Sequence, residues 1–312
     1  MENNIVTYAP VVIPTLCRFE HFKRCVDSLS RCIHANQTEL IIGLDYPHKE
    51  SHVEGHSKIL DYLNNGITGF KKVTIIKQSK NIGALLNYYQ LLNYAFNFYD
   101  GIIVSEDDNE FSPNFLDYIN RGLVRYNEVD EVVAICGYNY PAEMMDYSQK
   151  AYLSHNFSAW GCGIWKSKNE KYQAEYTPEN SRKILRSPIA MLKILAKKPT
   201  LAISLWYMVR HKIILEDVNR ELYNIIGNHY CLFPRLSLVR NWGHDGSGLN
   251  CGDYDNDIYQ KQPIDANHEF DLNDEISVIT PQFNKRLRKF FGDRPHDLIL
   301  RTCRFIKRKI FS

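Results

Sequence analysis

Apolar residues in the N-terminal third of the chain follow two alternating patterns. Short runs of β-branched and other apolar residues predict buried strands, and apolar residues at helical spacing between them predict amphipathic helices. The predicted strands are 11–15, 40–44, 73–77 and 101–105, and the predicted helices are 18–34 and 84–99. The polar stretch 45–72 leaves a further helix open. Strands that alternate with helices in this way predict an α/β nucleotide-binding fold with a parallel sheet.

The residues that follow the predicted strands are polar or charged. They are Thr15 to Arg18, Asp45, Asn81, Glu106, Asp107 and Asp108. In an open parallel sheet, ligands bind beyond the carboxyl ends of the strands. Any one of these residues on its own is typical of a solvated loop. Because they follow several strands of one predicted sheet, together they favour a binding site.

The three consecutive carboxylates Glu106, Asp107 and Asp108 are the most specific chemical feature of the sequence. Adjacent carboxylates repel one another unless a cation or hydrogen-bond donors compensate their charge. Mg²⁺ and Mn²⁺ prefer oxygen ligands and often complete their coordination with substrate phosphates. The alternative is an acidic cluster at a helix N-terminus, because Ser112 and Pro113 resemble an N-cap and a first helical residue. That helix would start too late for Asp107 or Asp108 to cap it, so the pattern favours a metal site.

Composition and charge narrow the class of protein. The chain has 312 residues, of which 44% are hydrophobic and 24% charged, as is typical of a globular protein with a large core. The net charge of +2 gives no indication of a nucleic-acid partner. We see no signal-peptide pattern, and the most apolar stretch, 192–209, is interrupted by two lysines and a proline. The eight cysteines show no CxxC spacing, so we expect reduced thiols and neither disulfides nor a zinc site.

The carboxylate motif resembles the metal-binding element of a known class of enzymes. The letters EDD at a strand end, followed by FSPNF, are similar to the DxD-type element of GT-A glycosyltransferases. The similarity is greatest to the family of the N-acetylglucosaminyltransferase that initiates complex N-glycans and to its bacterial relatives in polysaccharide assembly. Further stretches resemble that family in the same order: VVIPTLCRFEHFKRCVDSL at 11–29, IIGLD at 41–45, NFSAWGCGIWKS at 156–167, and 214–248. A motif with this much matching context is more specific than an isolated DxD.

The resemblance implies a role for each matching residue. The implied nucleotide contacts are Arg18, Asp45 (on a uracil ring) and Asp107 (on the ribose). The implied metal ligand is Asp108, supported by Glu106, and the implied general base is Asp217. The implied acceptor-side loop contains Trp160, Gly161, Gly163 and Trp165. We add Thr15 to the nucleotide contacts because it ends the first strand. A family histidine in the helix before the EDD motif has no clear counterpart, and the nearest polar candidates are Asn81 and Asn87. Glu216 stands where the family has an aspartate before the base.

Asp217 also has a structural interpretation. It begins a predicted amphipathic helix with apolar residues on one side, namely Val218, Leu222, Ile225 and Ile226. An acid in the first turn of a helix is favourable because it offsets the helix dipole. The sequence therefore leaves both a general base and an ordinary first-turn acid open at Asp217.

The Gly-rich stretch 241–257 predicts a segment that approaches a ligand closely. Within it, we predict His244 as a second metal ligand and Trp242 and Asp245 as sugar contacts. A lone histidine is also typical of a hydrogen-bonded loop, and large aromatic residues such as Trp160, Trp165 and Trp242 are equally typical of a core.

We expect one α/β domain of the GT-A type, with a Rossmann-like nucleotide-binding mixed sheet flanked by helices, over 1–282. Its nucleotide-sugar-binding half would be 1–110 and its acceptor half 111–282. The remaining segment, 283–312, is basic and amphipathic and predicts a helical C-terminal extension. Contact of this tail with an anionic membrane surface and packing of a terminal helix on the domain are both open.

The sequence thus predicts an inverting glycosyltransferase that depends on Mn²⁺ or Mg²⁺. The expected donor is a nucleotide sugar, with UDP as the expected nucleotide, and the expected acceptor is a glycan or lipid-linked glycan in surface polysaccharide synthesis. Two alternatives stay open: a nucleotidyltransferase that acts on sugar phosphates, and a catalytically silent scaffold that binds sugar nucleotides. We expect a cytoplasmic protein, with peripheral attachment to the inner face of the plasma membrane left open.

Overall fold

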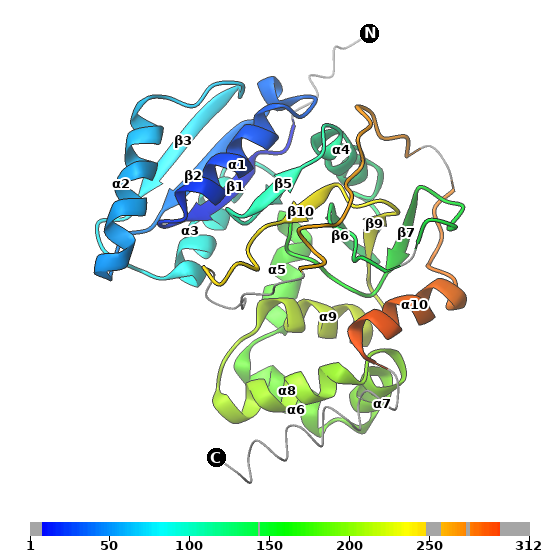
Figure 1. The fold of residues 1–312 in the computed structure, drawn as a ribbon. Helices are drawn as coiled ribbons and strands as arrows, with labels where there is room; N and C mark the ends of the chain where they lie inside the picture. Colours follow the sequence, from blue (N-terminus) through cyan, green and yellow to red (C-terminus); the bar gives the residue numbers. More distant parts are fainter. Residues whose placement is uncertain (1–7, 143, 248–256, 273–274, 294–312) are drawn as a thin grey trace.

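The computed structural model describes residues 8–142, 144–247, 257–272 and 275–293 (Figure 1). The strands are β1 Val11–Thr15, β2 Glu39–Leu44, β3 Lys72–Lys77, β4 Gly101–Val104, β5 Asn109–Phe111, β6 Val132–Cys136, β7 Ala151–Ser154, β8 Cys162–Trp165, β9 Tyr230–Pro234 and β10 Val239–Asn241. The α-helices are α1 Phe19–Ser30, α2 Glu50–Asn64, α3 Ala84–Phe96, α4 Phe115–Arg125, α5 Lys166–Glu175, α6 Pro178–Arg186, α7 Pro188–Lys197, α8 Thr200–His211, α9 Glu216–Gly227 and α10 Pro281–Phe291, with a 3₁₀ turn η1 at Ala35–Gln37.

An eight-stranded mixed sheet forms the centre of the molecule, in the order β3-β2-β1-β4-β8-β6-β9-β7. The first four of these strands are parallel, so their carboxyl ends lie along one edge. β8 is antiparallel to both β4 and β6, and it joins the N-terminal strands to those that come later in the sequence. Short strands β5 and β10 pair separately and lie just beyond the end of β4.

The side chains of each strand alternate between two hydrophobic cores, one on each face of the sheet. On β1, Val11 and Ile13 point into the core formed with α1, α2 and α4, while Val12 points into the core formed with α3 and α10. This alternation follows from the two-residue period of a strand, and continuous burial of β1 and β2 is typical of a sheet covered on both faces. The mixed α/β sheet flanked by helices that the sequence predicts is confirmed.

A third, smaller core holds together a group of helices below the sheet in Figure 1. It contains Ile194 of α7, Leu201 and Leu205 of α8, and Leu222 and Ile225 of α9. The predicted amphipathic helix that begins near Asp217 is therefore confirmed, and its apolar side packs on α7 and α8.

Helix α10 covers part of the predicted C-terminal tail. Its apolar residues Phe283 and Leu287 are buried in the core with α3, and Phe291 packs against the same core. Over 281–291, the structure thus has a terminal helix packed on the domain, with its basic residues Arg288 and Lys289 in the last turn. The rest of the predicted tail, 294–312, lies outside the described residues.

Several predicted boundaries change in the structure. The helix predicted from Pro113 begins at Phe115, because Pro113 belongs to a turn in which the Ser112 hydroxyl donates to Asn114 Oδ1 over 2.6 Å. The polar stretch 45–72 does contain a helix, α2, of which Ile59 and Leu63 are buried. The residues Lys197 to Pro199, which interrupt the apolar stretch 192–209, separate α7 from α8.

Two expectations about the chain as a whole can be compared with the described residues. All six cysteines in the described ranges are free thiols, and five of these are buried. Within the described ranges, no helix combines the length and apolar character that crossing a bilayer would require.

Candidate active site

The carboxyl ends of β1, β2 and β4 bring the predicted nucleotide and metal residues together. Thr15 ends β1 and is followed by Arg18, Asp45 follows β2, and Asp107 and Asp108 follow β4. All of these side chains except Arg18 are buried. Buried carboxylates require partners, and the structure supplies them from three separate elements.

Arg18 is the cation that compensates the two aspartates. Its guanidinium contacts Asp107 through one nitrogen and Asp108 through the other, at 2.8 Å from Asp108 Oδ2. The Thr15 hydroxyl donates to the second oxygen of Asp107 over 2.8 Å. Burial alone would lower the pKa of Arg18, but the two carboxylates raise it, so Arg18 stays charged. Burial, with the charge of Asp108, raises the pKa of Asp107 against the effect of Arg18.

Asp108 is also held from the side of β10. Asn241 Nδ2 donates to Asp108 Oδ1 over 2.7 Å, and the Trp242 amide donates to the Asp108 carbonyl oxygen over 2.9 Å. A Cβ atom at Gly243 would lie 2.2 Å from Asp108 Oδ2, so only glycine fits beside this carboxylate. The predicted Gly-rich segment therefore does approach the carboxylate edge, and it does so through the pairing of β10 with β5.

Asp45 organises the loop that connects β3 to α3. Its carboxylate accepts hydrogen bonds from the backbone amides of Ile82 and Gly83, at 3.0 and 2.9 Å, and from the Asn81 side chain at 3.1 Å. It also accepts one from the amide of Tyr46 at 2.8 Å. The predicted residues Asp45 and Asn81 are thus brought together at this edge of the sheet.

Asn87 is fully buried on α3. Its side-chain nitrogen donates to the Gly43 carbonyl oxygen over 2.8 Å, which ties α3 to β2. Its predicted contact with a nucleotide stays a prediction.

Asp217 lies in the first turn of α9, where Leu215 is the N-cap. The residue is exposed to solvent, but enough protein lies near its carboxyl group to disfavour the ionised form. Burial raises its pKa to about 6, and the negative charges of Glu221 and Glu216 act in the same direction, against Arg220 and Lys198. Among the described residues, none donates a hydrogen bond to this carboxyl group. Asp217 is therefore an accessible carboxylate that ionises just below neutral pH.

Glu106, in the acidic motif, is affected by the charge of Asp217. Burial raises the pKa of Glu106 well above its usual range, and the charges of Asp108 and Asp217 raise it further. The tertiary structure thus brings the end of β4 and the start of α9 close enough for their acids to interact, although they are more than a hundred residues apart in the sequence. Pairs of acids whose environments separate their pKa values are typical of acid–base sites.

Two residues that the sequence analysis did not single out set the environment of Asp217. Glu221 and Lys198 form a buried ion pair of 2.7 Å, and both act on the pKa of Asp217. Glu221 could have been found from the sequence, because it follows Asp217 by four residues on the same predicted helix. Lys198 could not be found in this way, because it comes from the α7–α8 junction.

The predicted residues of the acceptor-side loop have mixed environments. Trp160 is partly buried and packs edge-on against Tyr138, with ring centroids 4.6 Å apart, and against His244 at 5.6 Å. Gly161 has φ of 70° and packs against Phe115, so a side chain there would be strained. Trp165 is buried and donates to the Leu123 carbonyl oxygen, which is the core role left open by the sequence.

His244 is buried near these rings. It stacks on Tyr259 at 4.4 Å, and its Nδ1 lies 3.6 Å from Asp257 Oδ2. These contacts are those of a packed histidine, and the predicted role as a metal ligand stays a prediction.

Trp242 and Asp245 lie at the outer end of the same segment. The Arg24 guanidinium covers the Trp242 ring at 4.3 Å from its centroid, and Trp242 Nε1 donates to Glu110 over 2.8 Å. Asp245 contacts His21 Nε2 at 2.8 Å. Although burial acts in the other direction, hydrogen bonds from Ser247 and the contact with His21 lower the pKa of Asp245 to about 2. Both predicted sugar contacts therefore lie against helix α1.

The described residues contain no group of three or more His, Cys, Asp and Glu side chains placed to hold a metal ion. Arg18 instead supplies the positive charge around which Asp107 and Asp108 are arranged. The donor chemistry still fits a hard cation, because Glu106 and Asp108 offer carboxylate oxygens and Mg²⁺ or Mn²⁺ commonly takes its remaining ligands from a diphosphate. Protein ligands alone do not complete such a site.

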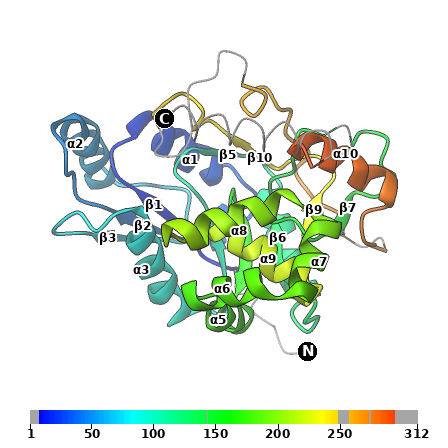
Figure 2. The ribbon, with the colours of Figure 1, turned by 90° about the horizontal axis from the view of Figure 1, so that it is seen from below.

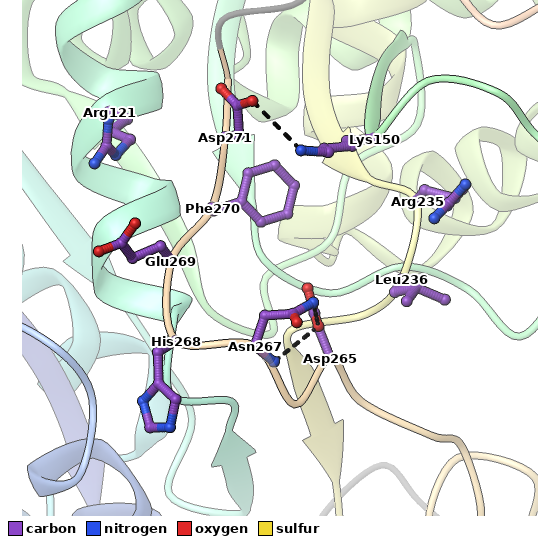
Figure 3. A pocket seen from close by; sticks show the side chains of 10 residues that line it. All are labelled: Arg121, Lys150, Arg235, Leu236, Asp265, Asn267, His268, Glu269, Phe270 and Asp271. Carbon is purple, nitrogen blue, oxygen red and sulfur yellow. Dashed lines mark hydrogen bonds and ion pairs between the residues drawn. The ribbon is translucent and has the colours of Figure 1, made fainter.

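A separate pocket of about 610 Å³ lies beside α4 and the segment 265–271 (Figure 3). It is lined by Arg121, Lys150, Arg235, Leu236, Asp265, Asn267, His268, Glu269, Phe270 and Asp271. Its acidic and basic side chains are nearly balanced, and Lys150 pairs with Asp271 at 3.4 Å. None of the residues predicted for the active site lines this pocket.

Parts of the chain are similar to solved structures of low sequence identity. No protein-family model matches the chain, and no curated protein sequence matches it. A similar solved structure is the mannosyltransferase PcManGT from Pyrobaculum calidifontis in complex with GDP-Man and Mn²⁺, at 13% identity and a TM-score of 0.36, with 53% of this chain and 47% of that chain covered. Another is S. aureus TarS, at 12% identity and a TM-score of 0.36, with 55% and 30% covered. This chain thus spans about half of the first and under a third of the second, and likeness at this level leaves the function to be argued from the site.

Proposed function

We propose that this protein is a nucleotide-sugar glycosyltransferase of the GT-A type, with its active site at the carboxyl edge of β1, β2 and β4. The observation that carries the proposal is the meeting of two groups of residues. One is the Arg18–Asp107–Asp108 cluster, and the other is the accessible acid Asp217, which acts on the neighbouring Glu106. Glycosyl transfer needs both a charged site for a diphosphate and a separate base for the acceptor.

The proposed reaction is a single displacement with inversion. Asp217 accepts the proton of the acceptor hydroxyl as its oxygen forms a bond to the anomeric carbon of the donor sugar. The bond between that carbon and the diphosphate oxygen breaks, and the nucleoside diphosphate leaves with the bonding electron pair. A carboxylate with a pKa of about 6 is mostly ionised at neutral pH and is a suitable base for this step.

The residues of the sheet edge bind and orient the donor. The loop held by Asp45 meets the base of the nucleotide, which we propose is uridine, and Thr15, Arg18 and Asp107 meet its ribose and phosphates. A divalent ion, held by Asp108 and Glu106, would neutralise the departing diphosphate. The acceptor is proposed to be a glycan or lipid-linked glycan of a surface polysaccharide.

A panel of nucleotide sugars tests the reaction class. With the acceptor present, we expect the wild type to release nucleoside diphosphate from one of the donors. We expect Asp217→Asn to lose this release. A nucleotidyltransferase would instead release pyrophosphate from a nucleoside triphosphate and a sugar phosphate. A silent scaffold would bind a nucleotide sugar and leave it intact, and either result would contradict the proposal.

Calorimetry of UDP binding tests the metal. We expect affinity that requires Mn²⁺ or Mg²⁺ and that falls in Asp108→Ala. Equal affinity with the metal present or chelated would mean that Arg18 supplies the whole positive charge of the site.

A further inference from the structure

Among the outer helices α6, α7 and α8, the last two expose large apolar side chains, and so does the loop that follows α8. In Figure 1 they lie below α9, away from the sheet, and Figure 2 shows them from below. The exposed large apolar residues of this region are Ile189, Leu192, Leu195, Tyr207, Ile213, Ile214 and Leu215. On α7, Ile189 and Leu192 are 72% and 68% exposed, whereas Ala190 and Ile194 on the opposite side are buried. The small core of these helices is therefore complete without the exposed residues, which leaves an outward apolar face.

The same region is strongly basic. Between 178 and 215 the exposed basic residues are Arg182, Lys183, Arg186, Lys193, Lys197, Arg210 and Lys212, and the single acid is Glu179. Lys198 is turned inward and paired with Glu221. Since the whole chain has a net charge of only +2, the remaining residues together are net negative. Positive charge is thus concentrated on the helices that also expose apolar side chains. We call this surface, 182–215, the outer helical face.

We propose that the outer helical face docks on an anionic phospholipid bilayer. Exposed aliphatic side chains flanked by lysine and arginine are the pattern by which amphipathic surfaces enter the headgroup region, where apolar burial and attraction to acidic lipids act together. The docking does not rest on the proposed reaction.

Charge decides against the other possible occupants of this face. The last described residue, Asp293, accepts a hydrogen bond from the amide of Thr200 over 3.1 Å and so lies at the start of α8. Residues 294–312 follow it in the sequence. That segment is itself basic, with Arg294, Arg301, Arg304, Lys307, Arg308 and Lys309 against Asp297. Two basic surfaces repel, and the same repulsion opposes a second copy of this face. An acidic bilayer attracts both the face and the segment.

The position of the loop 213–215 connects docking with the site. Ile213, Ile214 and Leu215 are exposed and immediately precede Glu216 and Asp217. Docking through this loop would place the start of α9 near the lipid surface. If the proposed function holds, the acceptor hydroxyl of a lipid-linked glycan would then be presented next to Asp217.

Co-sedimentation of the full chain with vesicles tests the proposal. The vesicles are phosphatidylcholine alone, or phosphatidylcholine with an equal amount of phosphatidylglycerol. We expect binding to the acidic vesicles only, which weakens as salt screens the charges. Three substitutions, Arg182→Gln, Lys183→Gln and Arg186→Gln, should together weaken binding about 100-fold, because each basic residue near such a surface contributes a factor of about five.

A matched variant controls for loss of charge. Lys49→Gln, Lys58→Gln and Lys71→Gln remove three exposed charges around α2 and β3, and they should leave vesicle binding close to that of the wild type. An apolar variant with Ile189→Ser, Leu192→Ser and Leu195→Ser should also lose binding and keep its thermal stability. Donor hydrolysis in solution should be unchanged in all three, so failure of docking and failure of the proposed function are distinguishable.

Three outcomes would overturn the proposal. The first is wild-type protein that does not bind acidic vesicles. The second is binding that survives the Arg182, Lys183 and Arg186 substitutions but is lost in Arg301→Gln, Arg304→Gln and Arg308→Gln, which would make the C-terminal segment the anchor. The third is a dimer in sedimentation velocity that the apolar variant dissociates, which would make a second copy the occupant.

Discussion

Replacing Asp217 by asparagine distinguishes a general base from an ordinary acid at a helix start. The change is nearly isosteric and removes one ionisable group from the first turn of α9. If Asp217 takes the proton of the acceptor, the transfer rate should fall roughly 10²- to 10⁴-fold, the usual contribution of general-base catalysis. Donor affinity should stay near the wild-type value, because Asp217 has no described contact with Arg18, Asp107 or Asp108.

The same substitution should stabilise the protein above about pH 6. Burial raises the pKa of Asp217 from 3.8 to about 6, so the folded state disfavours the ionised form that the unfolded chain adopts. An acid with a raised pKa lowers stability progressively as pH rises from its unfolded to its folded value, and the loss is constant above that window. A rise in pKa from 3.8 to about 6 corresponds to about 3 kcal/mol for a fully buried group, and solvent around this side chain leaves about 1 kcal/mol.

For a chain of 312 residues, that free energy corresponds to a rise in Tm of about 2 °C. A first-turn acid that only offsets the helix dipole predicts the opposite sign, since its removal would cost about 0.3–1 kcal/mol. The assay combines single-turnover transfer at saturating donor with thermal unfolding at pH 5 and pH 7.5. Near-normal transfer together with a lowered Tm in Asp217→Asn would remove Asp217 from the mechanism.

Three further predictions follow from the same contacts. Glu221→Gln removes the largest of the charges that raise the pKa of Asp217, so the acid limb of the pH–rate profile should move to lower pH; an unmoved limb would mean that another group titrates. Arg18→Gln leaves Asp107 and Asp108 without their cation and should cost about 3 kcal/mol of stability by thermal unfolding, with Mn²⁺ restoring more of the Tm than in the wild type. Gly243→Ala places a Cβ atom against Asp108, so the free energy of unfolding should fall by about 1–3 kcal/mol. UDP binding measured by calorimetry should also weaken, and wild-type affinity would show that the loop shifts freely.

The sequence alone determined the N-terminal strands and the residues at their ends. Runs such as Val11–Thr15 and Glu39–Leu44 are local patterns of β-branched and apolar residues, and burial on both faces of a sheet requires such patterns. The parallel order of these strands carries Arg18, Asp45 and Asp108 to one edge. The helix that begins near Asp217 is local in the same sense, because its apolar residues repeat at helical spacing.

Only the tertiary structure decided which charges meet. The partner of Asp107 and Asp108 is Arg18, the partner of Asp108 on its other side is Asn241, and Glu106 interacts with Asp217 across the fold. These contacts depend on the pairing of β10 with β5 and on the placement of α9. Neither can be read from the local spacing of apolar residues in the sequence. The three adjacent acids in the sequence indicate that their charge must be compensated. Only the fold shows that Arg18, 89 residues before Asp107, supplies part of the counter-charge.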